Sequence, residues 1–159
     1  MLRFVRSRAF RLALLFAATL GFSQDAANPW PESAAVEPAD LARTLRSSAK
    51  KPAIICVAFP VLYRSKHIPA AVFAGPGGKP EGIEALKKAV AGMAKDSDIV
   101  LYCGCCPMSR CPNIRPAYQA LKEMGFSQVR ILRIPTNIVT DWYSKDYPWE
   151  PGSAGEAGQ

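Results

Sequence analysis

Hydrophobic residues form a series of separate blocks along the chain, and three of these blocks have the character of buried strands. Residues 52–59 and 99–102 are unbroken apolar runs, and the last clear strand is expected at 129–134. Runs of this length without polar alternation are typical of strands covered on both faces. A shorter run at 71–73, after a loop that contains His67, predicts a further short strand.

Segments in which apolar residues recur at helical spacing alternate with these strands. The first helix is expected from Pro38, a residue that suits the first helical position, and the third runs from Pro116 to Met124 and ends at Gly125. The apolar positions are Leu41, Ala42 and Leu45 in the first helix, Ile83, Leu86, Val90 and Met93 in the second, and Ala117, Ala120, Leu121 and Met124 in the third. Alternating strands and helices predict one α/β domain with a mostly parallel sheet flanked by helices, which binds ligands at the carboxyl ends of its strands.

Residues 1–23 have the features of a secretory signal peptide. Four arginines and no acidic residue precede an apolar run at 12–22, and small residues follow it. The arginines are Arg3, Arg6, Arg8 and Arg11. That run is about half of the roughly 20 residues that cross a bilayer. We therefore expect cleavage near Ser23 and a secreted or periplasmic protein that is not inserted in a membrane after cleavage.

Charge and composition limit the possible partners. The 159 residues carry a formal net charge of +7, and subtracting the four leader arginines leaves +3. Lysine pairs at 50–51 and 87–88 lack interleaved aromatic residues, so they indicate solvated faces and no nucleic-acid partner. A mildly positive surface favours small anionic substrates. A hydrophobic share of 49% suits one packed domain at 36–150, between a Pro- and Ala-rich lead at 24–35 and a disordered tail at 151–159.

Four of the five cysteines lie in one short loop. Cys103, Cys105, Cys106 and Cys111 stand between the strand at 99–102 and the third helix. Backbone N–H groups and the positive end of a helix meet in such a loop, and both stabilise a thiolate and an anion bound beside it. The fifth cysteine, Cys56, lies in an apolar strand and is expected to be a small buried hydrophobe.

Several short segments follow one another in a distinctive order between residues 36 and 150. They are a Pro-containing first helix, His67-Ile68-Pro69-Ala70-Ala71, the strand that ends at Cys103, Gly125-Phe126 after a helix, and a closing Trp142 with Tyr147-Pro148. In this order they resemble the rhodanese-like domain, in which the second segment usually reads His-Ile-Pro-Gly-Ala. The resemblance implies a sulfurtransferase without a cofactor. In that family, the cysteine that ends the central strand takes a sulfane sulfur from a donor such as thiosulfate, as a persulfide, and passes it to cyanide or a thiol.

The chain departs from the usual pattern of that family at two places. The family loop is shorter and has an arginine about five positions after the cysteine, whereas Arg110 is seven positions after Cys103 and Pro107 offers no N–H. Cys105 has the family spacing to Arg110, so Cys105 or Cys106 is the second choice for the nucleophile. Cys56-Val57-Ala58 also stands where the family often has Asp-x-Arg.

The resemblance and the loop together predict a set of site residues. By position, Cys103 is the nucleophile, and Cys111 is the preferred resolving thiol, with Cys106 as the alternative. The residues expected to bind substrate are Gly104, Cys105, Cys106, Ser109 and Arg110, where Arg110 would add a cationic donor. The expected partners are a small anionic sulfur donor and a thiol acceptor, and no metal ligand is assigned. His67 is expected in a structural loop, and the aromatic residues at 142–149 are expected to pack on the core.

Two other classes of function use the same loop. In an oxidising compartment the cysteines would serve thiol–disulfide chemistry, with Cys103 or Cys106 paired to Cys111. Alternatively, the thiolates would bind Cu(I) or Zn²⁺, which soft sulfur ligands select. Four thiolates at such tight spacing are hindered from closing one tetrahedral site, whose usual form is two separated Cys-x-x-Cys pairs.

Overall fold

A computed structural model describes residues 28–152 as an α/β domain around a five-stranded sheet. The strand order is β1-β6-β5-β2-β4, and every pair in this sheet is parallel. The strands are β1 (Ala35–Val36), β2 (Ala53–Cys56), β4 (Val72–Phe73), β5 (Ile99–Tyr102) and β6 (Val129–Leu132). The expected fold class is therefore confirmed.

The apolar runs become the middle of the sheet. β5 has the predicted bounds, and its four residues are all buried between β2 and β6. β2 is shorter than its apolar run, and β6 is shorter than the strand expected at 129–134. Val57 and Ala58 stay buried after β2 has ended, and Pro60 then begins a helix, α2 (Pro60–Ser65). Burial explains why the runs are apolar, whereas the length of each strand depends on where its neighbours end.

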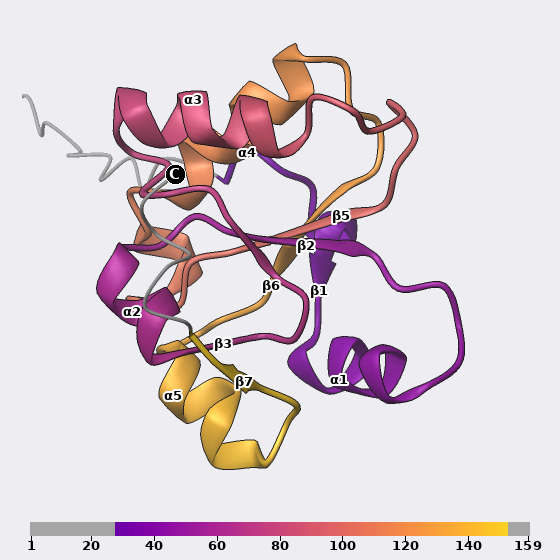
Figure 1. Ribbon diagram of the computed structural model, residues 1–159, viewed down its shortest axis with the longest axis vertical. Coiled ribbons are helices and arrows are strands. Elements are labelled where there is room, and N and C mark those ends of the chain that lie inside the picture. The colour runs from indigo at the N-terminus through magenta and orange to yellow at the C-terminus, as the bar shows by residue number, and fades with distance from the viewer. Residues whose placement is uncertain (1–27, 153–159) are drawn as a thin grey trace, which may run out of the picture.

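Helices cover both faces of the sheet (Figure 1). α3 (Pro80–Ala89) and α4 (Ile114–Glu123) lie together on one side, and α1 (Pro38–Arg46) and α5 (Ile138–Asp141) lie on the other. The three predicted helices are confirmed with two differences. α4 begins two residues before Pro116, and α3 ends at Ala89, before the expected helical positions Val90 and Met93. Gly125 follows α4 with φ of +86°, a left-handed conformation that suits glycine at a helix end.

Several short elements carry no strong sequence signal. They include α2 where we expected a loop, the edge strand β1, and three short 3-10 turns at Glu32–Ala34, Met108–Arg110 and Tyr143–Lys145. A separate antiparallel pair joins β3 (Lys66–His67) to β7 (Glu150–Pro151). Two-residue strands have no periodicity to detect, so pairing with a distant segment defines them.

Both ends of the described chain pack on the domain. Trp30 is buried against Tyr118 with ring centroids 5.6 Å apart, and buried Trp142 donates from its indole N–H to the Pro148 carbonyl at 2.8 Å. Trp142 therefore packs as expected, whereas Trp149 remains 46% exposed. The predicted signal peptide and most of the predicted tail lie outside the described residues. Among residues 28–152 no helix is long and apolar enough to span a membrane.

Candidate active site

The cysteine loop begins at the carboxyl end of the central strand. β5 lies between β6 and β2 in the sheet, and Cys103 follows its last residue. The side chain of Cys103 is only 3% exposed. This is the position at which open α/β sheets bind their ligands, as the sequence pattern predicted.

Gly104 turns the chain out of the strand, and only glycine fits there. Its φ is +80°, and its carbonyl accepts a hydrogen bond from the Ile138 N–H at 3.0 Å. A Cβ at this position would lie 2.6 Å from Ile138 Cβ, well inside normal contact. The turn is therefore fixed against the first residue of α5, and it directs the next residues back over Cys103.

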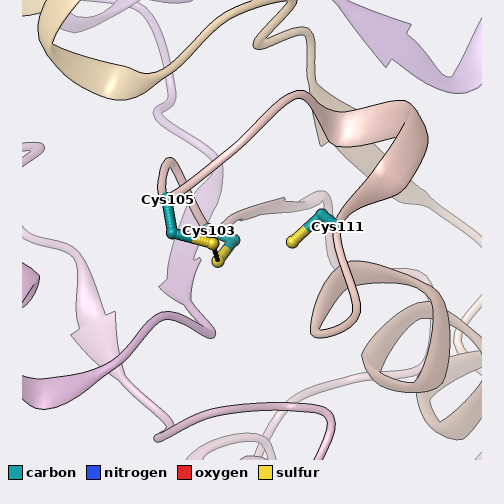
Figure 2. Close-up of side chains that lie close together, drawn as sticks. All are labelled: Cys103, Cys105 and Cys111. Atoms are coloured by element: carbon teal, nitrogen blue, oxygen red, sulfur yellow. Dashed lines mark hydrogen bonds between the residues drawn. The ribbon is translucent and has the colours of Figure 1, made fainter.

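Three sulfur atoms gather as a result. The Sγ atoms of Cys103, Cys105 and Cys111 all lie within 4.8 Å of one another, and Figure 2 shows them pointing toward a common centre. The Sγ atoms of Cys103 and Cys105 are 3.2 Å apart and hydrogen-bonded, and Cys106 Sγ lies 3.2 Å from Cys105 Sγ. All five cysteines are free thiols. The loop thus places four thiols in one chain of contacts.

Asn113 is a site residue that the sequence analysis missed. Its side chain is 2% exposed, its Nδ2 donates to Cys103 Sγ at 3.4 Å, and its Oδ1 accepts from the Gly78 N–H at 3.0 Å. The amide of Asn113 therefore provides a hydrogen-bond donor directly at the Cys103 sulfur. An asparagine directly before the apolar face of α4 was the available signal, because buried amides require partners.

Burial and mutual contact keep the other thiols protonated. Burial raises the pKa of Cys105 to about 12 and also raises the pKa of Cys106. Hydrogen bonding with Cys103, followed by burial, raises the pKa of Cys111 well above its usual range. Backbone N–H groups of Asn113 and Ile114, at the start of α4, hydrogen-bond to Cys111 and act in the opposite direction. At neutral pH these three side chains are therefore proton donors toward any thiolate in the cluster.

Ser109 and Arg110 lie at the rim of the loop. Both are exposed on the short 3-10 turn at Met108–Arg110, which is anchored by a 2.8 Å hydrogen bond from the Met108 N–H to the Ile134 carbonyl. Arg115 donates to the Ser109 carbonyl at 2.9 Å. The charge of Arg110 favours the thiolate of Cys106. The structure thus brings Arg110 near the cysteines without burying it among them.

His67 and Cys56 have structural surroundings. His67 is 2% exposed, stacks on Tyr63, and makes hydrogen bonds through Nδ1 to the Tyr63 carbonyl and through Nε2 to Glu150 Oε1. Cys56 is fully enclosed at the end of β2, and burial raises its pKa to about 11. Cys56 is the buried hydrophobe expected from the sequence, whereas His67 has a structural setting, as expected, but lies in strand β3 and not in a loop.

A hollow opens beside Cys105. It has a volume of about 400 Å³ and is lined by Leu62, Gly104, Cys105, Asn137, Ile138, Val139 and Thr140. A second hollow of about 270 Å³ shares Leu62, Ile138 and Val139 with it and reaches Tyr143. We call the first one the Cys105 hollow. Its lining includes Cys105 but not the buried Cys103.

Comparison with known families identifies the fold and the position of the loop within it. The model of the family described as "Rhodanese-like domain" matches residues 37–133, which is more than half of the chain. The chain belongs to the rhodanese-like domain family. The match spans β2, β5 and the whole cysteine loop, so Cys103 ends the central strand of a rhodanese-like domain.

Solved structures show the same fold at low sequence identity. The BH2092 protein of Bacillus halodurans superposes with a TM-score of 0.58 and 23% identity, covering 75% of this chain and 77% of its own. The Alr3790 protein of Anabaena sp. gives a TM-score of 0.56 and 20% identity, with 73% and 82% covered. A thiosulfate sulfurtransferase from Pseudomonas aeruginosa gives 0.55 and 21%, with 76% of this chain and 20% of that protein covered. No curated protein matches the chain significantly.

Proposed function

We propose that this rhodanese-like domain is a sulfurtransferase or sulfane-sulfur carrier that uses Cys103 as its nucleophile. The observation that carries the proposal is the place of Cys103, at the carboxyl end of the central strand, with the amide of Asn113 donating to its sulfur. The proposed donor is a small anion such as thiosulfate. The Cys103 thiolate attacks the outer sulfur, the S–S bond of thiosulfate breaks, and sulfite leaves with the electron pair. The product is a persulfide on Cys103. A thiol or cyanide then attacks the outer sulfur and removes it from Cys103.

Replacing the nucleophile tests this proposal. We expect Cys103→Ser to lower sulfite release from thiosulfate by at least about a thousandfold, because a serine hydroxyl does not ionise near neutral pH. The free energy of unfolding should change by no more than about 1 kcal/mol, because the two side chains are similar in size. Normal turnover in Cys103→Ser with loss in Cys105→Ser or Cys106→Ser would move the nucleophile within the loop.

Cys111 is proposed as the resolving thiol when no acceptor is present. Its Sγ lies within 4.8 Å of Cys103 Sγ, and its position eight residues along the chain leaves room to close a ring. Attack of Cys111 on the inner sulfur forms a Cys103–Cys111 disulfide and releases hydrosulfide. Stoichiometric thiosulfate should therefore yield that disulfide in the wild type and a longer-lived persulfide in Cys111→Ser. Equal persistence of the persulfide in both proteins would exclude this role.

A second candidate function, binding of Cu(I), is favoured by the sulfur cluster. Three thiolates at about 2.3 Å from one ion stand about 4.0 Å apart. The Sγ atoms of Cys103, Cys105 and Cys111 lie within 4.8 Å of one another, so small rotations would suffice. Soft thiolates select Cu(I) over harder ions. Titration of the reduced protein with Cu(I) against a chromogenic chelator should then give one ion per chain and a much weaker site in Cys111→Ser. A site of unchanged affinity in that variant would refute this candidate.

Export is proposed from the leader at residues 1–23. Four arginines ahead of a short apolar run support cleavage near Ser23 and a secreted or periplasmic protein. Amino-terminal sequencing of the protein recovered from separated cell fractions should find a new amino terminus near residue 24. Recovery of the intact chain with Met1 from the cytosol would contradict export.

A further inference from the structure

We propose that Cys105 relays the sulfane sulfur from Cys103 to an acceptor thiol with an apolar body, bound in the Cys105 hollow. This inference rests on the proposed sulfurtransferase function and adds the route by which sulfur leaves. Cys103 is 3% exposed, and the Cys105 hollow is lined by Cys105 instead. A small acceptor can approach a buried persulfide, whereas a larger thiol meets Cys105 first.

The contact between the two cysteines suits the transfer. A persulfide adds its outer sulfur about 2.05 Å beyond Cys103 Sγ. Cys105 Sγ is 3.2 Å from Cys103 Sγ, so rotation about the Cβ–Sγ bond of Cys103 carries the outer sulfur toward Cys105.

Protons and electrons balance without an added oxidant or reductant. Cys105 sulfur bonds to the outer sulfur as the bond between that sulfur and Cys103 Sγ breaks, and the bonding pair stays on Cys103. The thiol proton of Cys105 passes to Cys103 along the hydrogen bond that already joins the two sulfurs. One thiol and one persulfide anion are present before and after the step, so the exchange is close to balanced in free energy. Cys105 begins this step as a protonated thiol, in keeping with its burial.

The hollow defines the class of acceptor. Leu62, Ile138 and Val139 give it an apolar lining, and its volume of about 400 Å³ falls within the range of small-molecule sites. The acceptor sulfur would lie at Cys105, with its carbon chain along the three aliphatic residues. Each methylene buried there improves binding about fourfold. A thiol with a short alkyl chain should therefore be preferred to an equally nucleophilic thiol without one.

Two acceptors of different size test the relay. Cyanide and 6-mercaptohexanol are compared with thiosulfate as donor, and 2-mercaptoethanol serves as the short-chain reference. We expect Cys105→Ser to lower the ratio of transfer to 6-mercaptohexanol over transfer to cyanide at least tenfold. The control change Cys56→Ala, at a buried cysteine outside the loop, should move this ratio less than twofold. Fragment mass spectrometry of the loaded wild type should locate the extra sulfur on Cys105 as well as Cys103.

A second pair of variants tests the hollow without altering a cysteine. Val139→Asp places a charge in the apolar lining and should remove most of the preference for 6-mercaptohexanol over 2-mercaptoethanol, which is at least about tenfold if two of the four additional methylenes are buried. Val61→Asp, an equally drastic change at an exposed valine outside the hollow, should leave that preference intact.

Failure of the relay and failure of the proposed function give different results. Stoichiometric sulfite release from the wild type with an unchanged acceptor ratio in Cys105→Ser would overturn the relay alone. Release of hydrosulfide with a Cys103–Cys105 disulfide, in the presence of acceptor thiol, would also overturn it. Absence of sulfite release from the wild type would overturn both.

Discussion

At the scale of single residues, the site depends on one amide that faces a sulfur. Asn113 donates to Cys103 and accepts from Gly78, so both halves of its side chain are engaged. The sequence located the cysteines because thiols in a loop between strand and helix indicate a definite chemistry. It did not locate Asn113, because the amide has a role only once the loop of Gly78 is packed against the start of α4.

Substitution of Asn113 separates its two contacts. Asn113→Asp keeps an acceptor for the Gly78 N–H but replaces the donor to Cys103 by a negative oxygen. We expect single-turnover release of sulfite from thiosulfate at pH 7 to slow about tenfold or more, because a hydrogen bond to a thiolate contributes roughly 1.5–3 kcal/mol.

Asn113→Ala loses both contacts, so it should slow the same reaction and also lower the free energy of unfolding by about 1–3 kcal/mol. Stopped-flow sulfite detection and urea unfolding measure the two effects. Wild-type rates in Asn113→Asp would remove Asn113 from the site.

At the scale of elements, the sequence predicted those parts of the fold that are buried. β5 has its predicted bounds because each of its four residues faces the interior. α2 was missed because only six residues form it, and a single turn or two gives no recognisable period. The convergence of three sulfurs was also beyond the sequence, since it requires the turn at Gly104 and its contact with α5.

Two glycine substitutions measure what that turn requires. Gly104 and Gly125 both have positive φ, but only Gly104 would bring a Cβ against another residue, and a Cβ at Gly125 would meet nothing within 4 Å. Gly125→Ala should therefore lower the free energy of unfolding by about 1 kcal/mol, the cost of the backbone conformation alone.

Gly104→Ala should cost roughly 2–4 kcal/mol, because the clash with Ile138 is added to the same backbone cost. Urea denaturation of the two variants gives both values. If both variants lose the same free energy of unfolding, α5 accommodates the added methyl group at Gly104 without a further loss of stability.

At the scale of the whole molecule, a buried thiol and a buried phenol make the free energy of unfolding depend on pH in the alkaline range. Burial raises the pKa of Cys56 from about 9 to about 11 in the folded protein, and burial also raises the pKa of Tyr102. Above pH 9 the unfolded chain releases the Cys56 proton and the folded chain retains it. The unfolded state then binds fewer protons, so the free energy of unfolding falls as the pH rises.

The loss is largest between pH 9 and 11. For Cys56 alone we expect roughly 2–3 kcal/mol across that window, with full stability below it. Urea unfolding at a series of pH values between 7 and 11 tests this expectation. Cys56→Ala should be less stable at pH 7 but should show a shallower decline, because only the contribution of Cys56 is removed. An identical decline in both proteins would assign the effect to other groups.

The pairing of β3 with β7 determines when this region can fold during synthesis of the chain. Glu150 Oε1 is hydrogen-bonded to His67 Nε2 at 3.1 Å and accepts a hydrogen bond from the Ala70 N–H at 2.9 Å. A residue of β7 thus provides the hydrogen-bond partner for a segment that is synthesised about 80 residues earlier. A ribosome delivers residues 66–70 long before residue 150. Until that residue emerges, the imidazole of His67 has no carboxylate, and the backbone of Ala70 has no acceptor from this source. A nascent chain therefore reaches its native arrangement in this region only after residue 150 has left the ribosome.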